Sequence, residues 1–347
     1  LAGVLVDKLD ENDERQLFDD VEMPLVSVLA GMEARGGLID RDYLEELGGD
    51  LRSQLADLEV AIHQEAGGPF NINSTLQLRE VLYDRLELPV LKKTSKGAPS
   101  TDASVLKKLS TAHPIVEHLL RYRELEKLRS TYVDGYLPLI APDGRIHTSF
   151  NQIAAATGRL SSDNPNLQNI PVRSETGRLI RRAFIPEDGW TFLVADYSQI
   201  ELRILAHLSG DPGLLEAFTS EQDIHTATAA RVFERELEDV SQELRGRAKA
   251  INFGLLYGME AFGLADRLEI SRDEATEHID AYFAQFPDVR EFMDSVVVEA
   301  KRLGYTETMF GRRRYLPELK SDNFRIRQMG ERMALNAPIQ GAAADII

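Results

Sequence analysis

Hydrophobic residues recur every three or four positions along most of the chain, and this spacing predicts a mainly helical protein. Residues 21–35 follow it and end at a Gly-Gly pair, which is typical of a helix end. Further helices are predicted over residues 40–67, over 75–86 with Ser74 as the N-cap, and from Pro114 to about residue 132. The first 140 residues are therefore expected to form mostly antiparallel helices.

The pattern changes near Gly144. Residues 145–151 alternate between apolar and polar positions, which predicts a strand, and the apolar run at 191–195 is typical of a buried strand. A hairpin is predicted at residues 306–316, turning at Phe310-Gly311. The remaining stretches predict an ordered irregular segment at 157–171, helices over 211–304, and a last helix from about Asp322. The fold class predicted is α+β and mostly helical.

Charge first argues against a nucleic-acid partner, because the 347 residues carry a net charge of −17. The distribution weakens that argument. Residues 1–67 hold 17 acidic and 5 basic residues, whereas residues 301–327 hold 3 acidic and 8 basic residues. Residues 145–182 are also net positive. The acidic excess is therefore concentrated near the N-terminus, where a solvated helix face explains it.

Composition excludes several classes of protein. No run reaches the roughly 20 apolar residues of a membrane span, so no membrane partner is expected. The absence of cysteine excludes disulfides, thiolate zinc sites and cysteine nucleophiles. No signal peptide opens the chain. Leu1 is not a start methionine, and the chain stops at Ile347 in the middle of an apolar helical pattern. We therefore expect both ends to be cut.

The first chemical candidate is a carboxylate at a predicted strand end, Asp196, followed at once by a predicted helix start. A carboxylate fixed on a strand edge suits Mg²⁺, which binds one or two carboxylates together with substrate phosphates. The ordinary alternative for Asp196 is a satisfied polar residue. Ser198 and Glu201 have the spacing of a capping box, which is the ordinary explanation of Glu201.

The second candidate is a stripe of residues four apart, Arg245, Lys249, Phe253 and Tyr257. On a helix, each step advances roughly 6 Å along one slowly drifting face. Two cations followed by two aromatic rings match a nucleoside triphosphate lying along the helix, with its phosphates at the cations. The alternative is an amphipathic helix with two solvated charges and two core rings.

Taken together and in this order, these segments resemble the family A DNA polymerases of the bacterial DNA polymerase I type. The resemblance covers nearly the whole chain, including Pro69-Phe-Asn-Ile-Asn-Ser74 in the helical first part. It rests on the following motifs: Thr157-Gly-Arg-Leu-Ser-Ser162, Pro165-Asn-Leu-Gln-Asn-Ile-Pro-Val-Arg173, Asp196-Tyr-Ser-Gln-Ile-Glu-Leu-Arg203, Asp223-Ile-His225, the segment from Arg245 to Gly258, Gly311-Arg-Arg-Arg-Tyr-Leu-Pro317 and Asn336-Ala-Pro-Ile-Gln-Gly341.

The resemblance implies a right-hand fold with an incomplete antiparallel palm sheet. A linker and the start of the palm would occupy residues 1–39, the thumb 40–140, and the first part of the palm 141–220. The fingers would occupy 221–340, and 341–347 would be a truncated return to the palm. The implied partners are primer-template DNA and dNTPs. The resemblance also implies a monomeric protein that acts in the bacterial cytoplasm, at the nucleoid.

The resemblance also implies roles for single residues. Asp196 would ligate two Mg²⁺ ions, with the Tyr197 carbonyl on one of them. Lys249 would be catalytic, as a proton donor to pyrophosphate. The implied nucleotide-binding residues are Arg245, Lys249, Phe253, Tyr257, His225, Glu201 and Gln199. The implied DNA-binding residues are Arg159, Arg173, Asn336, Gln340, Lys92, Lys93 and Lys96.

One feature departs from the family pattern. The family needs a second metal carboxylate in a His-Asp-Glu motif, a few tens of residues after the segment that Gln340-Gly-Ala-Ala-Ala-Asp345 matches. The chain stops before that motif, so the sequence predicts a polymerase fragment that is inactive alone.

Three alternatives stay open. The first is a non-catalytic DNA-binding module, because half of the metal site is missing. The second is a relative of the single-subunit RNA polymerases, against which Glu201 and Phe253 argue because they fill the sugar edge. The third is a metal-dependent hydrolase, which Asp223-Ile-His225 supports only weakly because its spacing lacks partner ligands.

Overall fold

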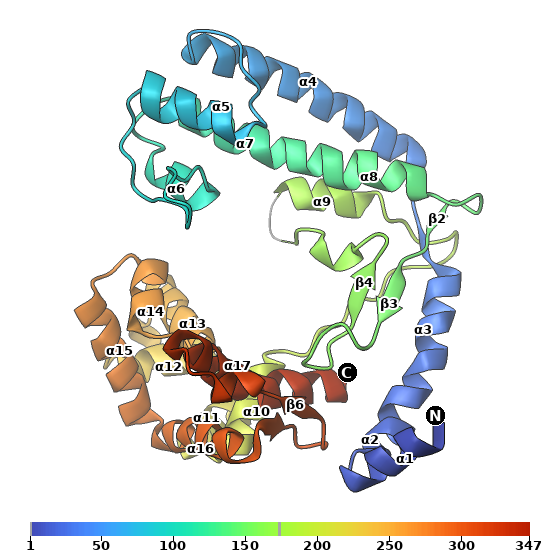
Figure 1. Cartoon of the computed structure of the whole chain (residues 1–347), viewed down its shortest axis with the longest axis vertical. Coiled ribbons are helices and arrows are strands. Elements are labelled where there is room, and N and C mark those ends of the chain that lie inside the picture. Colours follow the sequence, from blue (N-terminus) through green and yellow to red (C-terminus); the bar gives the residue numbers. More distant parts are fainter. Residues whose placement is uncertain (1, 173–174) are drawn as a thin grey trace. The chain divides into compact units, whose positions relative to one another are not determined.

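The computed structural model describes residues 2–172 and 175–347, and it is mostly helical with three small two-stranded sheets (Figure 1). The chain forms two compact units. Unit 1 consists of Leu1–Leu29, Asn151–Ser161 and Val194–Ile347, and unit 2 consists of Ala30–Phe150 and Ser162–Leu193. Each unit has its own hydrophobic core.

Unit 2 is built around two long helices that lie side by side, α4 (Arg41–Glu65) and α7 (Ile115–Leu128) (Figure 1). Asp40 caps α4, since its Oδ1 accepts a hydrogen bond of 2.9 Å from the Tyr43 backbone N–H. Fully buried side chains from both helices, such as Leu44 of α4 and Leu119 of α7, belong to one hydrophobic core. The shorter helical segments are α5 (Thr75–Arg79), η2 (Glu80–Arg85), α6 (Ala103–Lys108), η3 (Arg129–Val133), α8 (Asp134–Tyr136), η4 (Leu137–Leu139), η5 (Leu167–Asn169) and α9 (Glu175–Arg182).

The strands are short. In unit 2, β1 (Gly37–Leu38) pairs antiparallel with β2 (Arg145–Ile146). The segments β3 (Ser149–Asn151) and β4 (Ser161–Asp163) form a second pair where the chain passes between the units. The strand predicted at residues 145–151 is thus present as two pieces, β2 and β3.

Unit 1 packs a set of helices around the buried Tyr282 and Phe286 rings. A hairpin of β5 (Tyr305–Glu307) and β6 (Arg313–Tyr315) confirms the turn predicted at Phe310 and Gly311. The helical segments are α1 (Ala2–Glu11), α2 (Arg15–Leu17), η1 (Phe18–Glu22), α10 (Ile200–Ser209), α11 (Pro212–Thr219), α12 (Ile224–Val232), η6 (Leu237–Asp239), α13 (Gln242–Leu256), α14 (Ala261–Leu268), α15 (Arg272–Gln285), α16 (Pro287–Leu303), η7 (Pro317–Lys320) and α17 (Phe324–Ile346). Helix α3 (Met23–Arg35) runs from unit 1 into unit 2.

The predicted buried strand at residues 191–195 is wrong. Residues 191–197 have no regular secondary structure, and Leu193 and Val194 are 91% and 88% exposed. A strand needs a neighbour for its backbone hydrogen bonds, and no segment among the described residues pairs with this run. The apolar run is compatible with a buried strand, but its sequence does not specify which neighbouring strand would pair with it.

The other predicted elements are confirmed. Helices occupy the ranges predicted near residues 21–35, 40–67, 75–86 and 114–132, and Ser74 caps α5 by accepting from Gln77 N–H. Within residues 2–172 and 175–347, no helix combines the length and the apolarity that crossing a bilayer requires.

Candidate nucleotide site

The predicted stripe lies on a real helix. Ser241 caps α13 by accepting from the Leu244 N–H, and Tyr257 is the C-cap residue, followed by Gly258 at φ +67°. A residue with positive φ ends a helix, and glycine adopts that conformation without strain. The four predicted residues are all partly exposed, whereas Ala248, Ile251 and Leu255 on the opposite side are buried. The stripe is thus the accessible face of α13.

The first cation of the stripe is held by a carboxylate. Asp223 is the N-cap of α12, and it accepts from the Thr226 N–H at 2.8 Å. It also accepts two hydrogen bonds from Arg245, from Nε at 3.0 Å and from Nη2 at 2.7 Å. Although partial burial alone would raise the pKa of Asp223, the hydrogen bonds from Arg245 and Thr226 outweigh it and lower the pKa to about 2. Lys249, in contrast, has no ion-pair partner among the described side chains.

A buried histidine stands beside the middle of the stripe. His225 is 2% exposed, and its ring centroid lies 5.7 Å from that of Phe253. Its Nδ1 is 3.1 Å from Asn252 Nδ2, and Asn252 also donates to Thr228 Oγ1 at 3.0 Å. Burial lowers the pKa of His225 to about 4, and the nearby charges of Arg245 and Lys249 act in the same direction. His225 is therefore neutral at pH 7.

The far end of the stripe meets Glu201. The Phe253 and Tyr257 rings are nearly parallel, with centroids 6.4 Å apart. The Tyr257 hydroxyl donates to Glu201 Oε2 at 2.6 Å, and Arg159 Nη2 forms an ion pair with the same carboxylate. Burial raises the pKa of Tyr257 to about 12, and the hydrogen bond to Glu201 adds to the shift. Glu201 itself is 8% exposed, so it closes the aromatic end of the stripe.

This arrangement overturns the capping-box explanation of Glu201. Helix α10 begins at Ile200, and its N-cap is Gln199, which has φ +56° and makes no side-chain capping bond. Ser198 therefore lies one position too early to cap the helix. Because the carboxylate of Glu201 bonds to Arg159 and Tyr257 instead, it belongs to the site.

The predicted metal ligand lies apart from regular structure. Asp196 and Tyr197 are exposed in the irregular segment before α10. Across the part of the chain that the structure describes, no group of three His, Asp or Glu side chains could hold a metal ion. Proteins usually provide only one or two carboxylate ligands to Mg²⁺, and phosphates and water provide the others. One accessible carboxylate is compatible with this ligand set. Asp196 fits such a partial site and does not by itself make a complete one.

Two predicted DNA contacts lie one turn apart on α17. Asn336 and Gln340 are both partly exposed. The Asn336 Oδ1 atom is buried and accepts no hydrogen bond from any described group. A buried acceptor without a donor costs free energy, roughly 1–3 kcal/mol.

The remaining predicted DNA contacts are in unit 2 or outside the described residues. Lys92, Lys93 and Lys96 are exposed on the loop before α6, and Lys92 forms an ion pair of 3.3 Å with Asp102. Arg173 lies outside the residues that the structure describes.

Comparison with known sequences decides the family. The family model described as DNA polymerase family A matches residues 41–347. The chain belongs to this family. The resemblance stated from the motifs is therefore confirmed.

Bacterial DNA polymerases are among the relatives of the chain. It is 52% identical to DNA polymerase I of Geobacillus stearothermophilus, covering 100% of this chain and 40% of that protein. It is also 52% identical to the thermostable DNA polymerase I of Thermus aquaticus, covering 97% of this chain and 41% of that protein. The chain thus spans about two fifths of the length of these relatives.

A solved structure matches nearly the whole chain. The POL domain of Pol1 from M. smegmatis, in complex with a DNA primer-template and a dNTP, superposes with a TM-score of 0.93 at 48% identity. The match covers 99% of this chain and 61% of that chain.

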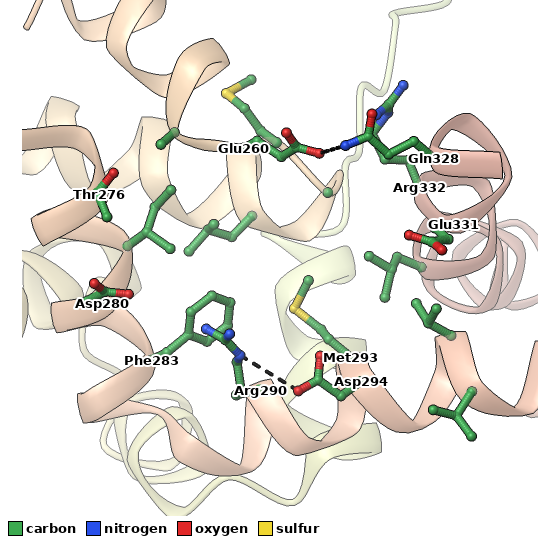
Figure 2. Close-up of a pocket in the computed structure, with 18 residues that line it drawn as sticks. Glu260, Thr276, Asp280, Phe283, Arg290, Met293, Asp294, Gln328, Glu331 and Arg332 are labelled. Atoms are coloured by element: carbon green, nitrogen blue, oxygen red, sulfur yellow. Dashed lines mark hydrogen bonds and ion pairs between the residues drawn. The ribbon is translucent and has the colours of Figure 1, made fainter. Parts of the chain in front are cut away.

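A hollow of about 630 Å³ lies elsewhere in unit 1 of this family A chain, between the end of α13 and helices α15, α16 and α17 (Figure 2). Its apolar lining includes Phe283 and Met293. Four of its polar groups bond to each other in pairs: Gln328 donates to Glu260 at 2.6 Å, and Arg290 pairs with Asp294 at 3.7 Å. Arg245, Lys249 and Phe253 do not line this hollow. The candidate site is consequently the exposed stripe of α13 and not this pocket.

Sequence reasoning missed two contributors to the site. The sequence places Asp223 in a family motif and in the weak hydrolase alternative, with no role at Arg245, yet in the structure it holds Arg245. Asn252 was overlooked, although it is fully buried and bonds to His225. The sequence does contain a signal for Asn252, since this polar residue falls on the buried side of an amphipathic helix. Buried amides require hydrogen-bond partners, so a polar neighbour was to be expected.

We expect His225 to stay neutral until the pH falls to about 4. The unfolded state, with an ordinary value of 6.5, binds more protons between these two pH values. The free energy of unfolding should therefore decrease as the pH drops from about 6.5 to about 4. NMR titration of the His225 ring, with thermal unfolding of the parent and of His225→Gln over this range, checks both statements. A ring that titrates near pH 6.5 would contradict the burial argument.

Proposed function

We propose that the polymerase containing this chain performs template-directed DNA synthesis, transferring a nucleotide from a dNTP to a primer 3′-hydroxyl. The observation that carries the proposal is the order of groups along α13, with cations at one end and Phe253 and Tyr257 at the other. The M. smegmatis complex with primer-template and dNTP supports it, since that structure superposes on 99% of this chain.

We assign the triphosphate to the cationic end. Lys249 presents an ammonium group that pairs with no described carboxylate, and Arg245 presents a guanidinium that Asp223 keeps in place. Negative charge that develops on the transferred phosphoryl group is stabilised by such fixed cations. Lys249 is also our candidate for donating a proton to the leaving pyrophosphate. His225, being neutral and buried, would act as a hydrogen-bonding partner and not as a third positive charge.

We assign the sugar to the space between Phe253 and Glu201, with Gln199 beside it. Glu201 is held by Arg159 and Tyr257, so its position is fixed before a nucleotide arrives. A bulky group in a fixed position excludes a substrate that carries an extra hydroxyl, which is selectivity by a clash. This supports dNTPs over rNTPs and argues against the RNA polymerase alternative.

Asp196 and the Tyr197 carbonyl are the residues we propose for this chain's share of a magnesium site. When two Mg²⁺ ions are bound, they activate the primer hydroxyl and stabilise the leaving pyrophosphate. The family membership supports dependence on a metal.

We propose that the primer-template contacts Arg159, Asn336, Gln340 and Arg173, with Lys92, Lys93 and Lys96 on the duplex backbone. Asn336 is partly exposed, and we propose that its amide N–H group faces the DNA minor groove. The acceptors common to all base pairs in that groove would bind this donor. Such contacts bind DNA without reading its sequence.

The subdomain assignments stay a proposal: thumb at residues 40–140, first part of the palm at 141–220 and fingers at 221–340, after a linker at 1–39 and before a return to the palm at 341–347. A monomer acting at the bacterial nucleoid is likewise the state we propose, which the bacterial relatives support.

The test of the function uses the chain itself and fluorescence anisotropy of a labelled primer-template. With Mg²⁺ present, the dNTP that matches the template base should tighten duplex binding more than the three mismatched dNTPs. Asp196→Asn should abolish that tightening and spare duplex binding, because the phosphate-contacting surface remains. Duplex binding indifferent to dNTP, Mg²⁺ and Asp196 would favour the non-catalytic DNA-binding module.

Catalysis is tested in a chimeric polymerase, a full-length relative in which this chain replaces the region it matches. Lys249→Ala should lower kcat/KM for dNTP by about 100-fold or more, since it removes a cation from the developing charge. Arg247→Ala is the matched control, because Arg247 lies on the same helix but pairs with Glu243 at 2.9 Å. Equal losses in both variants, or a loss confined to duplex affinity, would contradict the assignment of the stripe to the triphosphate.

Sugar selectivity provides a separate prediction. Glu201→Ala in the chimeric polymerase should raise rNTP incorporation relative to dNTP, because it opens the space that a 2′-hydroxyl needs. Steady-state incorporation of each nucleotide measures the ratio. Ser198→Ala is the control, since Ser198 precedes α10 and does not cap it. If both variants change the ratio equally, the path of the chain before α10, and not the bulk of Glu201, sets the selectivity.

A further inference from the structure

Unit 1 contains a partly buried ion-pair cluster that the proposed chemistry does not use. Arg312, on the hairpin between β5 and β6, lies 2.6 Å from Asp345 near the end of α17 and 2.6 Å from Glu22 in η1. The Asp345 side chain has no exposed surface, and its second oxygen accepts from Thr308 Oγ1 at 2.8 Å. Glu22 also accepts from the Gln152 amide at 2.9 Å. Three segments distant in the sequence thus meet at one guanidinium group, and Glu22 links them to a fourth at Gln152.

The flat face of Arg312 lies against the backbone of Gly158. A methyl group placed on Gly158, which has φ +76°, would lie 2.5 Å from Arg312 Nε and 2.7 Å from its Cζ. The same loop is bounded by α17, because a methyl group on Gly341 would lie 2.5 Å from Thr308 Cγ2 and 3.5 Å from the Thr157 carbonyl oxygen. The loop at residues 157–158 is therefore packed without spare room between the hairpin and α17.

The residue after Gly158 is Arg159, whose guanidinium forms an ion pair with Glu201. Glu201 in turn accepts from the Tyr257 hydroxyl. We infer that Arg312 is a positioning residue for nucleotide selection, which acts by fixing Gly158 and thereby the reach of Arg159 to Glu201. The effect of Arg312 on catalysis rests on the proposed function. Its effect on the position of the loop rests on the packing alone.

Arginine suits this role better than lysine. Its planar group donates in two directions at once, to Asp345 and to Glu22, while its face covers the glycine backbone. A lysine would keep the charge near Asp345 and lose both the second ion pair and the flat contact. Rescue by Arg312→Lys should therefore be incomplete.

Hydrogen exchange of the chain itself tests the packing, independently of activity. In Arg312→Ala, amides of residues 151–161 should exchange at least about tenfold faster, because the loop loses its support. Arg313→Ala is the matched control: Arg313 is the next residue and the first of β6, but it pairs with Glu307 and stacks on Tyr305 at 4.7 Å. Unchanged exchange in a folded Arg312→Ala protein would overturn the inference.

A second variant tests the same contact with all charges kept. Gly158→Ala places a methyl group against Arg312 and should also speed exchange of residues 151–161. Gly97→Ala controls for backbone strain, since Gly97 has φ +83° and nothing within 4 Å of the added methyl. If Arg312→Ala fails to fold, the Gly158→Ala variant alone decides. Amides of residues 151–161 that exchange no faster in Gly158→Ala than in Gly97→Ala would count against the inference.

A double-mutant cycle in the chimeric polymerase tests the action through Arg159. Arg312→Ala should lower kcat/KM for dNTP by up to about 100-fold, as expected for a misplaced binding group. It should also shift the rNTP/dNTP ratio, and both effects should largely vanish in an Arg159→Ala background. Additive effects would show that Arg312 acts by another route. If the exchange results hold but the unmodified chimera does not extend a primer, the proposed function fails and the packing role stands.

Discussion

The regular rise of α13 is the constraint on which the candidate site depends. Residues four apart share a face of the helix, so helix geometry alone fixes the order of the side chains along the stripe. The charges of Arg245 and Lys249 come first, and the rings of Phe253 and Tyr257 follow. The two ends are then secured by residues from elsewhere, Asp223 at the cations and Glu201 at the rings. Helix geometry supplies the order and tertiary contacts supply the anchoring.

The helices could be predicted from the sequence because each one shows its apolar face in its own periodicity. The run at 191–195 could not, because an apolar run does not say which segment covers it, and here no described segment does. The stripe and the hairpin were predictable for the same local reason as the helices. The bonds from Asp223 to Arg245 and from Glu201 to Arg159 were not, because they join residues 22 and 42 positions apart.

Glu201 illustrates how a local motif can mislead. Its spacing from Ser198 satisfies the capping-box pattern, and nothing in the neighbouring sequence argues against a cap. The positive φ of Gln199 moves the helix start by one residue and leaves the glutamate free to turn toward α13. A non-glycine residue in that conformation is unusual, and here it lies directly before a residue of the candidate site.

The two cations of α13 differ in what an arriving anion must do. At Lys249 an anion meets an ammonium group that pairs with no described carboxylate, whereas at Arg245 it shares the guanidinium with Asp223, which accepts from Nε and Nη2. Asp223 thus partly neutralises the charge of Arg245, and a single anion gains less there than at Lys249. A polyphosphate that is already held at Lys249 reaches the remaining donors of Arg245 at high local concentration. The Arg245 end of α13 thus favours anions long enough to reach both positions.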